Sequence, residues 1–176
     1  MNPYHRIVQE GILLYEERLG NKGSKGESNP VHINARSKRQ ILYFPDGHFK
    51  TKRGKRHIYE ILDDQLNSPN LIIADIIQAY LTENVSLIQF IVPRQEDIEQ
   101  VQELAVTIYD RLVQMGISQK DLGGGVRIMD ISRDIAASKE AVADRLSSLV
   151  TPARKRKSRG SHRVFVRVSH TTPTSN

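Results

Sequence analysis

Three apolar segments between residues 71 and 115 constrain the fold of this sequence more than any other feature. Residues 71–81 carry apolar side chains around most of a helical circumference, which predicts a helix at the centre of a core. Residues 87–92, LIQFIV, are β-branched and aromatic and predict a buried strand. Residues 95–115 place their apolar side chains on one helical stripe, and Gly116 ends the pattern. Such a stripe is typical of core or dimer packing and does not indicate a cofactor site.

The chain before residue 71 predicts two more helices and one β-hairpin. Residues 4–19 repeat apolar side chains with helical spacing, and residues 20–30, GNKGSKGESNP, have the composition of a linker. Within residues 40–50, QILYFPDGHFK, the step Pro-Asp-Gly predicts a turn between two short strands. Residues 55–66 predict a helix that ends before Pro69, because proline disfavours helix in the residue before it.

The composition excludes several classes of protein. The 176 residues are enough to bury one core, or the cores of two small domains. The chain has no cysteine, which excludes disulfides and thiolate metal sites and fits a reducing compartment. Its most apolar run, residues 71–81, is interrupted by Asp75 and is shorter than the roughly 20 residues of a membrane-spanning helix. We therefore expect a cytoplasmic protein with no membrane partner.

Charge is segregated along the chain. Residues 1–58 hold 12 Lys and Arg against 5 Asp and Glu, residues 59–150 hold 7 against 15, and residues 151–176 hold 7 against none. An acidic middle therefore lies between two basic segments. Phosphate binding explains this segregation better than solubility does, because counterion release favours cations gathered on one surface. We expect nucleic acid as the partner, with ordinary surface solvation as the alternative.

The basic residues of the first segment gather around the expected hairpin. Tyr43, Phe44 and Phe49 alternate with these cations, and exposed aromatic side chains on a basic hairpin can stack unpaired bases. The hairpin is therefore a candidate for accessory contact with nucleic acid, with RNA as an alternative partner, although the same aromatics would serve equally well as core. The cations assigned to this contact are Arg36, Lys38, Arg39, Lys50, Lys52, Arg53, Lys55 and Arg56.

Residues 130–150, DISRDIAASKEAVADRLSSLV, predict two short helices joined by a tight turn. Ile131, Ile135 and Ala136 would form the buried face of the first helix. Ser138 is a natural N-cap for the second helix, because its hydroxyl can accept from amides two or three residues later. Polar side chains on the outward face can reach base edges in the major groove, and Ser138 can meet a phosphate. The second helix would bury Val142, Leu146 and Leu149 and turn outward Lys139, Glu140, Ala143, Asp144 and Ser147, with Arg145 at its edge.

This segment resembles the helix-turn-helix of the catabolite-activator family of bacterial transcription factors. I-x-x-x-I-A-A-S-K-E-A-V-A-D-R-L is similar to the family's I-G-x-x-x-G-x-S-R-E-T-V-x-R-x-L, most closely from Ser138 through the valine. The resemblance implies that Lys139 and Glu140 contact bases and that Ser138 contacts the DNA backbone. Asp144 stands where the family commonly has arginine, although Arg145 lies next to it. The family's β-roll for a cyclic nucleotide has no counterpart upstream, so that effector is not carried over.

Residues 154–168 predict a wing after the helix-turn-helix. Residues 158–161, Ser-Arg-Gly-Ser, predict a turn, and RVFVRV alternates so that its three valines share one face. Basic side chains at the tip of a wing grip phosphates or enter the minor groove. An ordinary helical hairpin followed by a disordered basic tail is the alternative. The wing residues assigned to DNA contact are Arg154, Lys155, Arg156, Lys157, Arg159 and Arg163.

Catalysis is the weaker hypothesis. A metal-dependent nuclease could use the acidic and histidine residues near position 57, but no recognised ligand motif joins them, and charged helix faces of this kind are usually solvated. These residues are His48, His57, Glu60, Asp63 and Asp64. Residues 123–125, Gly-Gly-Gly, are not followed by the lysine and Ser or Thr of a phosphate loop. We expect no enzymatic activity, no catalytic residue, no metal and no cofactor.

The sequence thus predicts a mainly α protein with small β elements, in which a C-terminal winged helix-turn-helix follows a helical region with a basic β-hairpin. Residues 1–94 would supply dimerisation and accessory nucleic-acid contact, residues 95–170 the DNA-binding domain, and residues 171–176 a disordered tail. The expected function is sequence-specific binding of double-stranded DNA by a nucleoid-associated transcriptional regulator that acts as a homodimer. Plasmid or phage replication or partition, RNA binding through the hairpin, and assembly through the long helix are the alternatives.

Overall fold

The computed structural model describes residues 2–25, 30–32, 42–63, 68–122, 124–149 and 167–168. Helices and strands alternate through most of this part of the chain. In chain order the elements are α1 (Pro3–Arg18), β1 (Lys22–Lys25), β2 (Val31–His32), β3 (Leu42–Tyr43), β4 (Gly47–Lys50), β5 (Arg56–Ile61), α2 (Pro69–Leu81), β6 (Val85–Val92), α3 (Asp97–Gln114), η2 (Gln119–Asp121), β7 (Gly125–Asp130), η3 (Ile135–Ala137), α4 (Lys139–Leu149) and β8 (Arg167–Val168).

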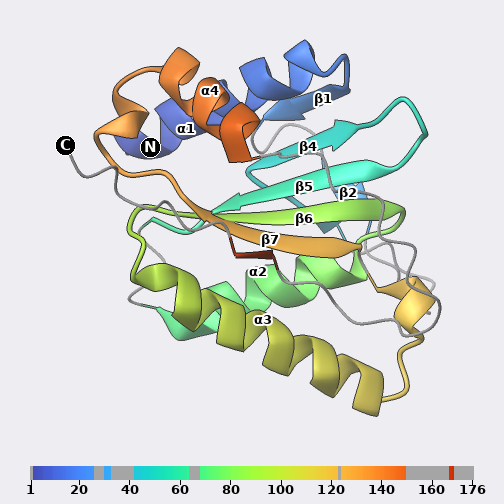
Figure 1. Ribbon diagram of the computed structural model, residues 1–176. Coiled ribbons are helices and arrows are strands. Elements are labelled where there is room, and N and C mark those ends of the chain that lie inside the picture. The colour runs from blue at the N-terminus through green and yellow to red at the C-terminus, as the bar shows by residue number, and fades with distance from the viewer. Residues whose placement is uncertain are drawn as a thin grey trace.

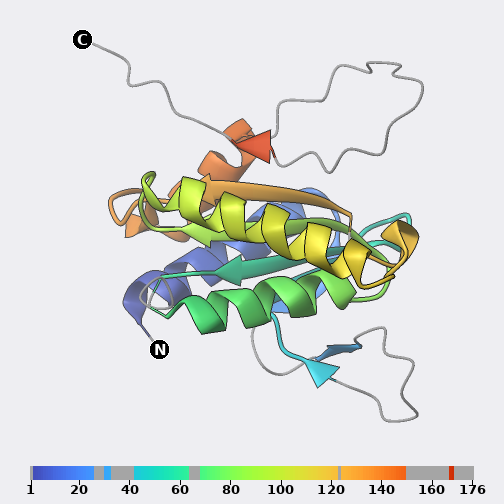
Figure 2. The same cartoon turned by 90° about the horizontal axis from the view of Figure 1, so that it is seen from below.

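A mixed six-stranded sheet, in the order β1-β4-β5-β6-β7-β8, forms the middle layer of the molecule. β5, β6, β7 and β8 run parallel to one another, whereas β4 pairs antiparallel with both β1 and β5. α2 and α3 cover one face of the sheet, and α1 and α4 cover the other, as Figure 1 shows. Figure 2, seen from below, shows α2 and α3 packed against each other in front of the sheet. β2 and β3 form a separate two-stranded pair.

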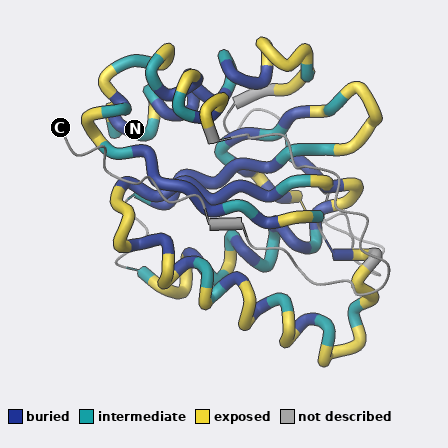
Figure 3. The backbone as a smooth tube through the Cα atoms, viewed as in Figure 1, coloured by how far each residue is buried: buried dark blue, intermediate teal, exposed yellow. Residues whose placement is uncertain are grey.

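Each face of the sheet has its own hydrophobic core. Under α2 and α3 the core is built around Ile76, Ile88 and Phe90. This core includes residues from both sides of residue 94, where the sequence predicts a domain boundary. Under α1 and α4 it includes Tyr59 and Val142. Because both faces are covered, the central strands are buried along most of their length, which Figure 3 shows as dark blue tube. Doubly covered parallel strands are therefore nearly continuous apolar runs in the sequence.

Glycines end the two longest helices. Gly20 follows α1 with φ 73°, and Gly116 follows α3 with φ 88°, both in the left-handed region that favours glycine. After α3 the Ile117 amide donates to the Leu112 carbonyl at 3.1 Å, and the Gly116 amide donates to the Val113 carbonyl at 2.9 Å. These two bonds are the Schellman arrangement. The predicted stop of the helix at Gly116 is confirmed.

Several predicted elements are confirmed in place. The helices predicted at residues 4–19, 71–81 and 95–115 are α1, α2 and α3, and the strand predicted at residues 87–92 is β6. The three helical segments are each longer than ten residues, whereas the strand was assigned from its short length and its β-branched and aromatic residues.

The predicted fold class is wrong. The protein is an α/β sandwich around a mixed sheet, and residues 55–66, predicted as a helix, contain strand β5. Residues 40–50 do not form a hairpin with themselves, because β3 pairs with β2 while β4 pairs with β1 and β5. Residues 125–130, for which the sequence predicted no strand, form the parallel strand β7.

The prediction of a C-terminal winged helix-turn-helix is also wrong. The expected first helix is the short 3₁₀ segment η3, three residues long, in a connection that leaves strand β7. α4 packs on α1 and the sheet, as one of the two helices of its layer. Residues 167–168, expected at the end of a wing, pair parallel with β7, whereas a wing requires two antiparallel strands. Residues 150–166 lie outside the described part of the chain.

Candidate nucleic-acid interface

A tight turn at residues 51–55 joins β4 to β5 and carries the densest group of cations in the described structure. The Thr51 amide donates to the Lys55 carbonyl at 2.8 Å, and the Gly54 amide donates to the Thr51 carbonyl at 2.9 Å. Gly54 has φ 77°, and a Cβ there would meet nothing within 4 Å, so backbone conformation rather than space selects glycine. The closed turn exposes the side chains of Lys52, Arg53 and Lys55.

Strand pairing adds more cations to this turn. Lys50 lies opposite Arg56 across the β4–β5 pair and opposite Lys22 across the β4–β1 pair. Among the described residues, none of these cations forms a salt bridge. We name this group the basic turn cluster; its members are Lys22, Lys50, Lys52, Arg53, Lys55 and Arg56. Like charges held together without carboxylate partners favour binding of an anion.

Beside the turn is a hollow, which we name the turn hollow. Three cations line it, Lys52, Arg53 and Lys55, together with His57 and the polar side chains of Asn21, Thr51 and Ser86. The lining comes from the α1–β1 connection, the β4–β5 turn and the starts of β5 and β6, so only the folded chain assembles it. Five residues of the basic turn cluster were predicted from the sequence to contact nucleic acid: Lys50, Lys52, Arg53, Lys55 and Arg56. Lys22, Asn21 and Ser86 were not predicted, because no local pattern connects them to the turn.

A buried carboxylate underlies the turn hollow. Glu16, near the end of α1, is fully buried, and it accepts from the His57 ring at 2.8 Å and from the hydroxyl of Tyr59. Its second oxygen accepts from the side-chain amide of Asn21. Burial acts to raise the pKa of Glu16, but the hydrogen bond and charge of His57 and the bonds from Tyr59 and Asn21 outweigh it and leave that pKa below its usual value. The carboxylate is therefore ionised.

On α4 the structure confirms part of the predicted geometry and corrects the rest. The Ala141 amide donates to the Ser138 hydroxyl at 3.1 Å, which confirms the N-cap, and Val142 and Leu146 are buried as predicted. Ala143, predicted to face outward, is buried as well. The side chain of Leu149 lies outside the described residues. The side of α4 that carries Val142 and Leu146 therefore faces the core as predicted. The packing of this side on α1 was not predicted.

Two of the α4 residues assigned to DNA contact, Asp144 and Arg145, form ion pairs within the protein. Arg145 is largely buried, and its guanidinium bonds the Asp130 carboxylate at 3.1 Å. Asp144 accepts from Arg18 of α1 at 2.7 Å. Lys139 and Glu140 are exposed at the start of α4. Nine assigned cations lie outside the described residues: Arg36, Lys38, Arg39, Arg154, Lys155, Arg156, Lys157, Arg159 and Arg163.

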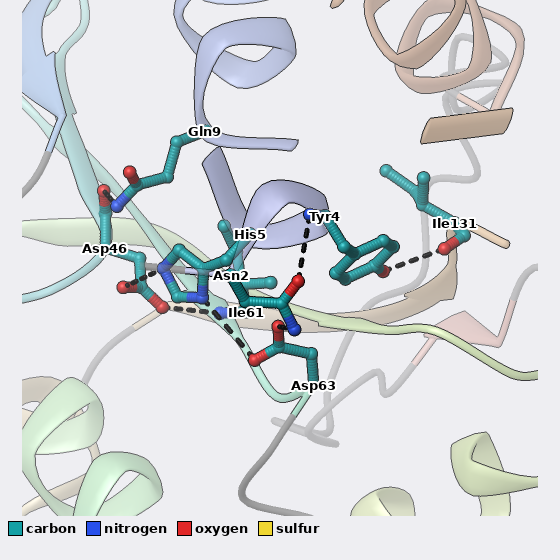
Figure 4. A network of polar contacts seen from close by, with 8 residues as sticks. All are labelled: Asn2, Tyr4, His5, Gln9, Asp46, Ile61, Asp63 and Ile131. Atoms are coloured by element: carbon teal, nitrogen blue, oxygen red, sulfur yellow. Dashed lines mark hydrogen bonds and ion pairs between the residues drawn. The ribbon is translucent and has the colours of Figure 1, made fainter. Parts of the chain in front are cut away.

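At the opposite end of β5, a polar network ties the start of α1 to the sheet. Figure 4 shows the His5 ring between two carboxylates, with Asp46 at 2.8 Å and Asp63 at 3.5 Å. Burial acts to lower the pKa of His5, but its bonds to these two carboxylates raise it to about 10. Asp46 also accepts from the Ile61 amide, and the Tyr4 hydroxyl donates to the Ile131 carbonyl. The polar groups of this network are occupied by one another, which fits a structural role.

The residues weighed for catalysis do not gather in one place. His57 lies near the start of β5, at the turn hollow, whereas Asp63 lies beyond the end of the same strand. Asp64 is outside the described residues. Among the residues that are described, no group of three or more His, Cys, Asp or Glu side chains is placed to hold a metal ion. In the same part of the chain, no helix is both long and apolar enough to cross a membrane.

Comparison of the chain with protein-family models, with curated proteins and with solved structures found no match.

Proposed function

We propose that the protein binds nucleic acid by holding backbone phosphates with the basic turn cluster, and that its ligand is double-stranded DNA. The observation that carries the proposal is the convergence of Lys50, Lys52, Arg53, Lys55 and Arg56 with Lys22, none of which forms a salt bridge within the described residues. Such a group binds a polyanion because each phosphate contact releases counterions from the nucleic acid.

The aromatic side chains favour a duplex over unpaired strands. Proteins that bind single strands stack bases on exposed aromatic rings. Tyr43 and Phe49 are 3% and 1% exposed and belong to the core, so they present no face to a base. Phe44 is 50% exposed, but it lies before β4, at the other end of that strand from the turn. The bases of a duplex are already stacked, so duplex binding needs cations and no aromatic platform.

Base reading is not part of this proposal. The sequence assigned it to α4, and there Arg145 bonds Asp130 while the apolar face packs on α1 and the sheet. Contacts to phosphates set affinity and position without specifying sequence. Homodimerisation and a role in transcription remain predictions from the sequence.

The test is a fluorescence anisotropy titration with a duplex DNA, a single-stranded DNA and a structured RNA, each at several salt concentrations. The test variant replaces Lys52, Arg53 and Lys55 by glutamine. At about 0.9 per phosphate contact, it should reduce the slope of log affinity against log salt by up to about 2.7 on duplex DNA. The matched control removes the same charge elsewhere, at the exposed residues Arg6, Arg111 and Arg133.

The control variant should keep most of the slope. Equal losses in both variants would mean that only net charge matters, and an unchanged slope in the test variant would place binding elsewhere; either result rejects the proposal. Tighter binding of RNA or single strands than of duplex would reject the duplex as ligand.

A further inference from the structure

Glu16 is a buried carboxylate, and its negative charge must be compensated inside the protein. A carboxylate taken out of water is costly unless its oxygens are hydrogen-bonded and its charge is compensated. Glu16 is fully buried and accepts from His57, Tyr59 and Asn21. Tyr59 is fully buried too, and burial, followed by the nearby Glu16 charge, raises its pKa well above the usual value, so it stays protonated. Of the three donors, only His57 can supply a compensating positive charge.

Glu16 also fixes which nitrogen of His57 faces outward. The Nδ1 atom bonds the buried carboxylate at 2.8 Å, and a carboxylate accepts, so Nδ1 carries a hydrogen. The hydrogen bond at one ring nitrogen determines the role of the other. Nε2 is therefore the nitrogen left for the turn hollow, which His57 lines, and no described residue is bonded to it. The His57 side chain is 19% exposed, so a ligand can reach it from outside.

The groups around Nε2 define the ligand. Lys52, Arg53 and Lys55 line the hollow with positive charge, and Thr51 adds a hydroxyl. The hydroxyl of Ser86, which also lines the hollow, donates to the Arg56 carbonyl at 3.2 Å and is not counted as a donor to the ligand. Lys52 approaches closely enough that a Cβ on Gly20 would lie 3.1 Å from its Nζ atom, so its ammonium lies against the end of α1. Cations and neutral polar groups suit a small anion with several acceptor oxygens. Phosphate and its esters meet that requirement, and charge-assisted bonds to phosphate are among the stronger protein hydrogen bonds.

We propose that the turn hollow is a phosphate-binding site, in which the Nε2–H group of His57 donates to a phosphate oxygen while Glu16 holds the ring in place. The inference rests on the proposed function, because it names the point where one backbone phosphate is seated. His57 is the contacting residue and Glu16 is a positioning residue. The chemistry serves equally for a backbone diester and for a free phosphate or nucleotide, so the test separates these sources.

The experiment follows the His57 ring by long-range ¹H–¹⁵N NMR during titration with sodium sulfate, whose charge is constant between pH 6 and pH 8. Loss of the signals in His57→Gln assigns them. We expect saturable shifts at Nε2 and only small shifts at Nδ1, because Nδ1 stays on the carboxylate. Lys55→Gln should weaken sulfate binding about tenfold. Lys50→Gln, which removes the same charge from the basic turn cluster but outside the hollow, should weaken it less than about threefold.

The role of Glu16 has its own spectroscopic readout. In the wild-type protein, Nδ1 should carry the hydrogen in every protonation state of the ring, which the ¹⁵N pattern reports without any variant. Glu16→Gln should abolish that preference and weaken sulfate binding. If that variant does not fold, the wild-type pattern decides alone: a ring with its hydrogen on Nε2 and a bare Nδ1 in the neutral state overturns the assignment.

A parallel titration with a short duplex DNA separates this inference from the proposed function. Shifts at His57 with both sulfate and DNA support the phosphate site and the proposed function. DNA binding that depends on the basic turn cluster but leaves the His57 signals unmoved overturns the phosphate site and leaves the function standing. Saturable sulfate shifts with no DNA binding support the site, overturn the function and assign the ligand to free phosphate or a nucleotide. Sulfate shifts that fail to saturate, or that Lys50→Gln reduces as much as Lys55→Gln does, overturn the site.

Discussion

Gly11→Ala tests the packing that replaces the helix-turn-helix. Gly11 lies on the buried face of α1, where α4 crosses it. A Cβ built on Gly11 would lie 2.4 Å from both Cβ and Cγ1 of Val142 and 3.0 Å from the Lys139 carbonyl oxygen. Carbon atoms in contact are normally about 3.5–4.0 Å apart. The added methyl group therefore fits only if the two helices move apart by roughly 1 Å.

Two opposing contributions determine the expected change in the free energy of unfolding. Overpacking of a buried site costs about 1–3 kcal/mol, and Val142 is fully buried, so a cost near the upper end applies. Alanine gains about 1 kcal/mol over glycine inside a helix. We expect Gly11→Ala to destabilise the protein by about 2 kcal/mol. A helix that left Gly11 uncovered would give the opposite sign, a gain of about 1 kcal/mol, so the sign alone distinguishes the two arrangements.

Equilibrium urea unfolding followed by circular dichroism measures this change. The matched control is Gly125→Ala, because a Cβ there meets nothing within 4 Å and its φ is not positive; it should change stability by less than about 0.5 kcal/mol. Val142→Ala removes one of the two clashing carbons, so Gly11→Ala should cost less in that background, with a coupling of about 0.5 kcal/mol or more. A stabilised Gly11→Ala variant, or additive effects with Val142→Ala, would refute the packing of α4 on α1.

Four further substitutions test charged groups by urea unfolding. Arg145→Ala should reduce the free energy of unfolding by about 3 kcal/mol, because it leaves the Asp130 carboxylate, which is 12% exposed, without its partner. Asp144→Ala should reduce it by less than about 0.5 kcal/mol, because the ion pair of Asp144 with Arg18 is exposed to solvent. Equal effects of the two substitutions would contradict this difference in burial. Burial and a nearby aspartate raise the pKa of Glu60 well above 4.5, so its contribution to stability is present below pH 4.5 and is lost as the pH rises. Glu60→Gln should therefore gain stability relative to wild type from pH 4.5 to pH 8, and parallel stability curves would argue against it. Burial lowers the pKa of His5 and two aspartates raise it to about 10, so its contribution is present below pH 6.5 and is lost as the pH rises through 10. In His5→Gln the decline between these values should be smaller, and a curve as steep as that of wild type would reject the ion pair.

The elements that sequence analysis located correctly are those whose evidence is local. α3 carries its apolar residues on one stripe over 18 residues, and α1 ends at a glycine with a positive φ. β5 was misassigned because Ile58, Tyr59, Ile61 and Leu62 satisfy two patterns at once. Positions three and four apart share a helix face, yet all four residues are buried here because helices cover both faces of the strand. Only the neighbouring strands and helices decide between these two structures.

The candidate interface, like the fold, could be predicted only where its evidence is local in the sequence. A run of cations at residues 50–56 is visible in the sequence, and the fold does bring them together. The hollow beside them needs Asn21 from the α1–β1 connection and Ser86 from β6, and the orientation of its histidine needs Glu16. These contacts join positions that are far apart in the chain, and a single sequence contains no local signal for them.

The resemblance to a helix-turn-helix shows where such a short match stops being informative. A capping serine followed by apolar residues at steps of four specifies the start of a helix and the side that faces inward, and Ser138, Val142 and Leu146 behave as that pattern requires. The same offsets serve any helix buried on one side, whether it packs on another short helix or, as here, on α1 and a sheet. What distinguishes these cases is the surface that receives the helix. On α1, Gly11 has no side chain, and this leaves the space that Val142 of α4 occupies. Gly11 lies more than a hundred residues before Val142 in the chain, so no local pattern connects the two.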